Sequence, residues 1–214
     1  MKPYWIKTRW FIKRLFNGFV WDIPNSSKTI YLTFDDGPTP MVTEWVLEVL
    51  QQHNIKATFF CIGNNIEKHP DIFQRVVSSG HSIGNHTFNH LNGWKTGNDS
   101  YYKNVSACAE AVKKATQRQD AITLFRPPYG KIKTVQAAWV RSRGYRIIMW
   151  DVLSADFDKA ITPEQCLHNV IANAREGSVI IFHDSVKAFP NLRYALPRAI
   201  EFLKEKGFSF EKII

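Results

Sequence analysis

Two adjacent aspartates, Asp35 and Asp36, occupy a position in the sequence where carboxylates need a chemical partner. They follow Thr29–Leu32, whose β-branched and aromatic residues predict a buried strand, and the Gly37-Pro38 pair after them predicts a turn. Ionised carboxylates resist burial unless a metal ion, a cation or hydrogen-bond donors compensate them. The pair is therefore either a chemical site or an Asp-rich turn held by its own Asx-type hydrogen bonds.

Two histidines four residues apart, His86 and His90, are candidates for that partner. On a helix this spacing puts both imidazoles on one face, and on a tight loop they can also converge. Two histidines and one carboxylate make an open zinc site, whose fourth position remains for water with a pKa lowered to about 7. If one aspartate binds the metal, its neighbour is free to accept the proton of the water. A structural role for each histidine is the alternative.

A third histidine, His183, follows the apolar run Val179–Phe182 and so stands at the end of another predicted strand. It is a candidate for the general acid that works opposite the carboxylate base, or else a structural residue after a core strand. Trp150 ends a predicted strand near the same site and is a candidate for contact with the substrate.

A regular alternation of strands and helices must position these residues. We expect strands at 29–32, 56–62, 81–85, 124–125, 145–150, 179–182 and 208–210, and helices at 41–52, 66–79, 100–118, 134–143, 163–174 and 192–206. Such alternation predicts one α/β domain with a mainly parallel sheet covered by helices. In these folds functional groups gather at the carboxyl ends of the strands, where the candidates stand.

Composition narrows the class of partner. The 214 residues carry a formal net charge of +9, which favours an anionic partner. Nucleic acid is disfavoured, because no basic block interleaved with aromatic residues appears in the body of the chain. Cys61, Cys108 and Cys166 show no CxxC spacing, so we expect neither a thiolate metal site nor a disulfide framework.

Residues 1–27 form a basic and aromatic N-terminal arm. Lysines and arginines interrupt every apolar run in it, so it lacks the pattern of a secretory signal, which predicts a cytoplasmic protein. The mixture of aromatic and basic residues is typical of an interfacial helix, and peripheral contact with the inner membrane is one expectation. An arm packed on the domain is the other.

Four ordered motifs carry a family resemblance. The runs Thr33–Pro38, His81–His90, Arg126–Gly130 and Ile181–Asp184 resemble those of the polysaccharide deacetylases, the NodB-homology group or carbohydrate esterase family 4. The resemblance spans nearly all of the chain after the arm, so residues 28–214 are assigned to this domain. It implies a distorted, incomplete (β/α) TIM-like barrel that removes acetyl groups from sugars with a divalent metal, usually Zn²⁺.

The resemblance also implies a role for each motif residue. Asp36, His86 and His90 would hold the metal, Asp35 would be the general base and His183 the general acid. Arg126 would orient Asp35, the backbone N–H of Tyr129 would bind the oxyanion, and Ile181 would line the acetyl pocket.

The fourth motif departs from the family pattern. Members often have Asp-x-x-Asp-Trp, where this chain has Leu153-Ser-Ala-Asp156-Phe157, so the first aspartate, which tunes the catalytic histidine, is missing. Asp151 lies on the same strand face two residues earlier, and we expect it to substitute for the missing aspartate. Asp184 is the second candidate for this role. Two other functions stay open: hydrolysis of a non-sugar amide on the same fold, and a glycan-binding protein with a degenerate site.

Overall fold

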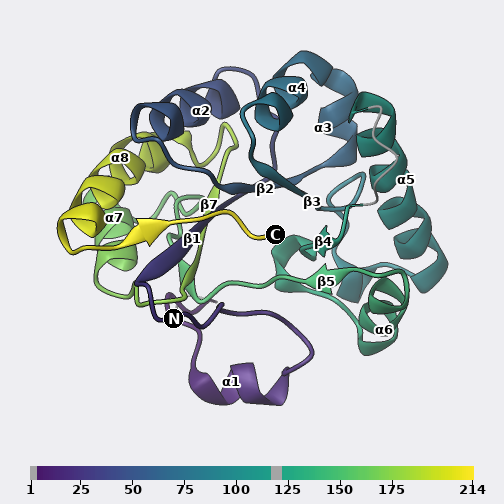
Figure 1. The fold of residues 1–214 in the computed structure, drawn as a ribbon. Helices are drawn as coiled ribbons and strands as arrows, with labels where there is room; N and C mark the ends of the chain where they lie inside the picture. The colour runs from purple at the N-terminus through teal and green to yellow at the C-terminus, as the bar shows by residue number, and fades with distance from the viewer. Residues whose placement is uncertain (1–3, 117–121) are drawn as a thin grey trace.

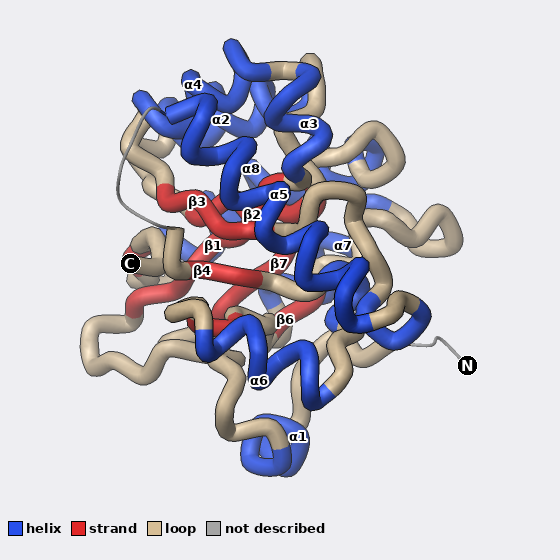
Figure 2. Tube along the Cα trace, turned by 90° about the vertical axis from the view of Figure 1, so that its right-hand side faces the viewer, coloured by secondary structure: helices blue, strands red, loops and turns tan. Residues whose placement is uncertain are grey.

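The computed structural model describes residues 4–116 and 122–214. They form a curled parallel sheet surrounded by helices, a distorted and incomplete (β/α) barrel (Figure 1). The tube view shows the same layering, with strands inside and helices outside (Figure 2). The predicted fold class is confirmed.

The elements follow the predicted alternation. The strands are β1 (Thr29–Asp35), β2 (Thr58–Cys61), β3 (Ser82–Asn85), β4 (Leu124–Phe125), β5 (Arg146–Ile147), β6 (Val152–Leu153), β7 (Val179–His183) and β8 (Ser209–Phe210). The α-helices are α1 (Trp10–Leu15), α2 (Val42–Gln52), α3 (Gly63–Lys68), α4 (Pro70–Ser78), α5 (Asn98–Thr116), α6 (Thr134–Ser142), α7 (Pro163–Ile171) and α8 (Phe189–Glu205). Short 3₁₀ turns lie at Gly93–Lys95 and Pro128–Gly130.

The helix expected at 66–79 is two helices. Proline favours the first turn of a helix, where its missing N–H costs nothing, and Pro70 accordingly begins α4. The helix expected at 100–118 is described as far as Thr116, and its last two residues lie outside the described ranges.

One extended segment supplies both edges of the sheet. The strand order is β5-β4-β3-β2-β1-β7-β6, with β8 paired to β1, and the ladders are parallel. Only residues 148–151 separate β5, which pairs with β4, from β6, which pairs with β7. Ile147 and Val152 are five steps apart along the chain, so at about 3.3 Å per residue the two edges are held within roughly 17 Å of each other. The sheet therefore has to curl into a barrel.

The alternation of β1 separates the core from the site. Ile30, Leu32 and Phe34 are fully buried in the apolar layer under the helices. Thr33 and Asp35 point the other way, into the barrel, because successive strand side chains face opposite sides. A polar interior at the carboxyl end of the strand follows directly.

The N-terminal arm pairs with the segment that closes the barrel. The Thr8 N–H donates to the Asp151 carbonyl at 2.9 Å, and the Leu153 N–H donates to the Ile6 carbonyl at 2.8 Å. Further along, the Val20 N–H donates to the Ile147 carbonyl at 2.8 Å. The described part of the arm, from residue 4, therefore extends the sheet and covers an otherwise open edge. Residues 1–3 of the predicted arm lie outside the described ranges.

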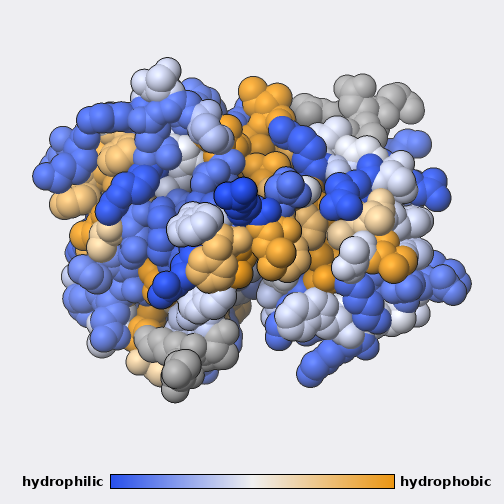
Figure 3. All heavy atoms as spheres, turned by 90° about the horizontal axis from the view of Figure 1, so that it is seen from below, coloured by the Kyte–Doolittle hydropathy of each residue, from blue (hydrophilic) through white to orange (hydrophobic). Residues whose placement is uncertain are grey.

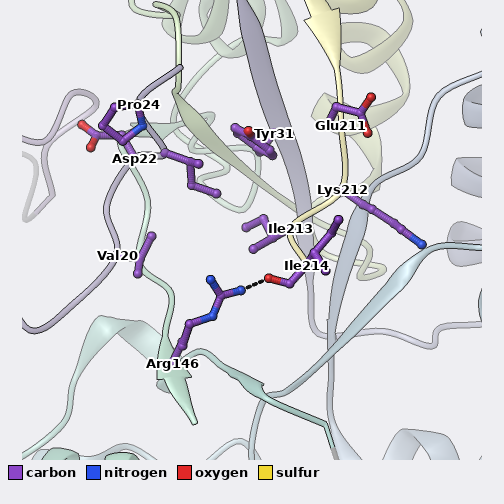
Figure 4. A pocket seen from close by; sticks show the side chains of 10 residues that line it. Val20, Asp22, Pro24, Tyr31, Arg146, Glu211, Lys212, Ile213 and Ile214 are labelled. Atoms are coloured by element: carbon purple, nitrogen blue, oxygen red, sulfur yellow. Dashed lines mark hydrogen bonds between the residues drawn. The ribbon is translucent and has the colours of Figure 1, made fainter. Parts of the chain in front are cut away.

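The amino-terminal end of the barrel carries a pocket that none of the motif residues lines. Tyr31 and Arg146, from the starts of β1 and β5, line it together with the segment after β8, and the Arg146 guanidinium donates to the Ile214 carbonyl (Figure 4). Cys61, Cys108 and Cys166 are buried free thiols. Within residues 4–116 and 122–214, no helix is long and apolar enough to cross a bilayer.

Candidate active site

Asp35 uses its two carboxylate oxygens differently. Oδ1 accepts a hydrogen bond from the Arg126 guanidinium at 2.7 Å, whereas Oδ2 lies 3.7 Å from Nε2 of His86. The side chain is almost fully buried. One oxygen is thus held by a cation, and the other faces the imidazoles.

Arg126 is a fully buried cation whose position is fixed from several sides. Its guanidinium also donates to the Thr33 hydroxyl at 2.7 Å and to the carbonyls of Ile148 and Met149 at 3.1 and 2.8 Å. Burial lowers the pKa of the guanidinium, and the charge of Asp35 opposes that shift. Because an arginine keeps its proton at any working pH, the pair supplies a fixed positive charge under Asp35.

His86 and His90 converge through a tight loop, which decides between the two geometries that their spacing allowed. Thr87 and His90 adopt positive φ angles of 61° and 53°, so the backbone turns twice within the motif. The Asn85 side chain accepts from the Thr87 N–H at 2.9 Å, and the Thr87 hydroxyl accepts from the Leu91 N–H at 3.0 Å. Local side-chain hydrogen bonds of this kind stabilise turns in place of a helix.

Asp36, His86 and His90 present one ligand atom each, and these atoms all lie within 4.8 Å of one another. Nδ1 of His86 lies 2.7 Å from the Arg126 carbonyl, which can only accept, so Nδ1 carries the proton and Nε2 keeps its lone pair. Burial lowers the pKa of both histidines, most strongly for His86, and favours the neutral form that binds metal.

The surroundings of Oδ1 of Asp36 show whether this triad suits a cation. This oxygen is buried and accepts no hydrogen bond from any described residue, although Nε2 of His90 lies 3.3 Å away. A buried carboxylate oxygen without a donor is costly, and a cation between it and the two imidazoles would compensate it. The donor set therefore fits a divalent metal.

His183 is held by Asp156, a residue to which the sequence had assigned no role. Nδ1 of His183 lies 2.7 Å from Oδ1 of Asp156, and the His183 N–H donates to Oδ2 at 2.7 Å. Burial alone would lower the pKa of His183, but the charge and hydrogen bond of Asp156 outweigh it and raise this pKa to about 9. The imidazole is consequently protonated at neutral pH.

The prediction that Asp151 tunes His183 is wrong. The Asp151 N–H pairs with the Val179 carbonyl, which puts Asp151 four residues, or roughly 13 Å, below the level of His183 in the barrel. Its carboxylate instead binds Lys7, Lys13 and the Ser178 hydroxyl. Asp151 therefore anchors the N-terminal arm, and Asp156 supplies the carboxylate that had been considered missing.

Asp184, the second candidate for that role, holds the turn after the aspartate pair. Its carboxylate accepts from the Gly37 N–H at 3.0 Å and from the Thr43 hydroxyl at 2.5 Å. A Cβ at Gly37 would lie 1.9 Å from Oδ2 of Asp184, so only glycine fits there. This contact fixes the backbone that carries Asp36.

Three further residues were predicted to contact the substrate or the oxyanion, and they lie at or near the carboxyl ends of the strands. Tyr129 has a φ of 61°, its N–H donates to no acceptor in the described part of the chain, and its hydroxyl lies 3.1 Å from Nδ1 of His90. Ile181 is buried on β7, on the same strand face as His183. The half-buried Trp150 ring lies against Gly130, next to Tyr129. Substrate contact by Ile181 and Trp150 stays a prediction.

The sequence of the chain matches a protein-family model. The model described as polysaccharide deacetylase matches residues 22–148, more than half of the chain. The chain belongs to the polysaccharide deacetylase family. The resemblance that the four motifs indicated is confirmed.

Curated relatives match this chain over most of its length. A peptidoglycan-N-acetylglucosamine deacetylase of Bacillus cereus is 37% identical over 87% of this chain and 67% of its own. A chitooligosaccharide deacetylase of Azorhizobium caulinodans is 32% identical over 89% of this chain and 95% of its own. A crystal structure of a peptidoglycan N-acetylglucosamine deacetylase with a bound N-oxidanyl-benzamide matches with a TM-score of 0.87 and 33% identity, covering 96% of this chain and 95% of the other.

The fold by itself does not settle activity within this group of deacetylase-like structures. A carbohydrate esterase family 4 pseudoenzyme from Bacillus anthracis shares the fold, with a TM-score of 0.81 at 23% identity over 90% of this chain and 66% of its own. The function of this polysaccharide deacetylase homologue must therefore be argued from its side chains.

Proposed function

We propose that this protein is a metal-dependent hydrolase that removes the acetyl group from an N-acetylated sugar within a polysaccharide, an oligosaccharide or a lipid-linked amino sugar. The observation that carries the proposal is the convergence of the Asp36, His86 and His90 ligand atoms around a buried oxygen without a hydrogen bond. The activities named for the relatives from Bacillus cereus and Azorhizobium caulinodans support an N-acetylated sugar as substrate.

The three residues of the triad would hold the metal. Two imidazoles and one carboxylate form a donor set that suits Zn²⁺ and leave room for further ligands. When bound, such an ion polarises a carbonyl group and acidifies water.

Asp35 is the proposed general base, acting through Oδ2. Oδ1 is occupied by Arg126, so Oδ2 is the oxygen available to accept a proton from the attacking water. Arg126 positions the carboxylate and balances its charge while it is buried. The N–H of Tyr129, which has no acceptor among the described residues, would donate to the oxyanion that forms on the acetyl carbon.

His183 is the proposed general acid, acting through Nε2. Its Nδ1 is directed to Asp156, so the second proton of the imidazolium lies on Nε2, on the side away from the carboxylate. A pKa of about 9 keeps that proton in place at neutral pH until the leaving amine takes it. Asp35 and His183 are register partners on β1 and β7, so base and acid lie side by side at the same level of the barrel.

Acetate release tests the proposal. The purified protein should release acetate from N-acetylglucosamine oligosaccharides, lose that activity when a chelator removes its metal, and regain it when Zn²⁺ is restored. Metal content measured on the same samples should rise and fall with activity. A metal-loaded protein that releases no acetate from oligosaccharides or from peptidoglycan would contradict the proposal. Glycan binding without turnover would favour a glycan-binding protein with a degenerate site. Turnover of non-sugar amides alone would favour a hydrolase of such amides on the same fold.

Asp156→Asn should move the basic limb of the pH–rate profile to lower pH. Removing the carboxylate removes the interaction that raises the pKa of His183, so the imidazole loses its proton at a lower pH. An opposite charge at this distance shifts a pKa by about 1–3 units, which sets the expected displacement of the limb. The measurement is kcat for acetate release from pH 6 to 10.

Asp151→Asn is the matched control for that displacement. It removes one carboxylate from the same segment, but at the anchor of the arm rather than beside His183. Its basic limb should coincide with that of the unmodified protein. Equal displacement in both variants, or none in Asp156→Asn, would show that Asp156 does not set the protonation of the catalytic acid.

A further inference from the structure

The N-terminal arm presents an exposed apolar surface that folding does not explain. We call Trp5, Trp10, Phe11, Leu15 and Phe16 the α1 patch. These five are among the eleven large hydrophobic side chains that are exposed in the described residues, and Trp10 and Leu15 are 72% and 71% exposed. No residue of α1 is buried. A cluster of this kind on one short segment marks an interaction surface.

The patch is presented by a fixed piece of backbone. Hydrogen bonds from Thr8 and Val20 tie the arm to the barrel on both sides of α1. Lys7 and Lys13 point inward and bind Asp151. The exposed side chains of α1 therefore sit on a braced loop rather than on a loose terminus.

Cations surround the patch. Residues 4–21 contain four lysines and arginines and no aspartate or glutamate. With Lys7 and Lys13 bound to Asp151, Arg9 and Arg14 are the cations that this segment exposes. A third arginine, Arg141 of α6, places its guanidinium against Gly18 in the same segment, 3.0 Å from the position that a Cβ would take there. Seen from the α1 side, apolar side chains gather near the centre of the face with strongly hydrophilic residues among them (Figure 3).

We propose that the α1 patch docks on the surface of an anionic lipid bilayer. Trp, Phe and Leu side chains enter the boundary between headgroups and acyl chains, while arginines beside them bind lipid phosphates. A second copy of this chain fits less well, because a two-fold contact through the patch would gather the arginines of both copies, Arg9 and Arg14 of each, at one interface without acidic residues from this segment to balance them.

The α1 patch is made of residues other than the catalytic ones. The described part of the arm begins at Tyr4, which packs on Phe157, and it pairs with β6 through Lys7 and Val152 before it reaches α1. The residues of the α1 patch are also absent from the triad and from the Asp35 and His183 contacts. Lipid binding is therefore separable from acetate release.

Sedimentation with lipid vesicles tests the proposal. The full-length protein should pellet with vesicles of phosphatidylglycerol and phosphatidylcholine and much less with phosphatidylcholine alone. Trp10→Ser with Leu15→Ser should weaken partitioning more than tenfold, because both side chains would be withdrawn from the bilayer. Arg9→Gln with Arg14→Gln should weaken it by roughly 30-fold at low salt, at about 1 kcal/mol for each arginine near the surface.

Matched variants elsewhere on the surface complete the experiment. Val135→Ser removes another exposed apolar side chain, and Lys113→Gln with Lys114→Gln removes two exposed charges from α5; both should pellet like the unmodified protein. Circular dichroism checks that each variant is folded. The vesicle assay does not depend on catalysis, so its result stands apart from the test of deacetylase activity. Unchanged pelleting of the Trp10 and Leu15 variant would overturn the proposal. The proposal would also be overturned if the protein did not bind anionic vesicles and the patch instead mediated a dimer or binding to insoluble glycan.

Discussion

Asp35→Asn is expected to keep its metal and lose its deacetylase activity. Asparagine preserves the shape of the side chain and the hydrogen bond from Arg126, but an amide does not accept the proton that Oδ2 would take from water. Loss of a general base lowers kcat by about 10²–10⁴-fold. The measurement pairs kcat on an N-acetylglucosamine oligosaccharide with metal content per protein chain.

The control for Asp35 is Asp71→Asn, which removes a carboxylate from the exposed first turn of α4. It should retain both metal and activity. If Asp35→Asn loses its metal, Asp35 is a ligand, and the division of roles between the two adjacent aspartates is wrong. If it keeps full activity, another group accepts the proton.

Asp36→Ala is expected to lose metal and activity together. It leaves only two imidazoles of the triad and removes the buried oxygen that the cation would compensate. Loss of a supporting partner of a ligand weakens metal binding by about 10–100-fold, so loss of the ligand itself should weaken it by at least roughly 100-fold. Competition with a chromophoric chelator measures the affinity, and excess metal should restore part of the activity.

A second variant separates metal loss from backbone strain. Asp36 has a φ of 87°, a conformation that alanine adopts only at a cost. Asparagine tolerates positive φ better, so Asp36→Asn should fold like the unmodified protein and still bind metal more weakly because its charge is gone. Full metal occupancy in both variants would contradict the assignment of Asp36 as a ligand.

The types and order of most elements could be predicted from the sequence. Hydrophobic periodicity and turn residues are local signals, and they placed the strands that carry Asp35 and His183 and the helices between them. Such local signals could not predict that the segment from β5 to β6 is divided into two strands. Its residues look like one strand, but their hydrogen-bond partners change from β4 to β7 along the segment, and only the curl of the sheet fixes that change.

The N-terminal arm shows the same limit. Its basic and aromatic composition was visible in the sequence, but composition could not choose between an arm packed on the domain and one directed at a membrane. Strand pairing and the Asp151 ion cluster hold the arm on the barrel and leave α1 exposed. A cytoplasmic location stays a prediction.

The sequence by itself determined which side chains could do chemistry here. They all lie at or after the carboxyl ends of strands, and parallel strands end at one face; they are Asp35, Asp36, His86, His90, Arg126 and His183. It did not determine which carboxylate reaches His183. A two-residue period tells which face of a strand a side chain occupies, but its height in the barrel depends on pairing with other strands. Pairing with β7 put Asp151 at the level of Val179, and the positive φ of Ala155 (60°) lies in the turn that brings Asp156 to His183. Only the tertiary structure could decide that contact.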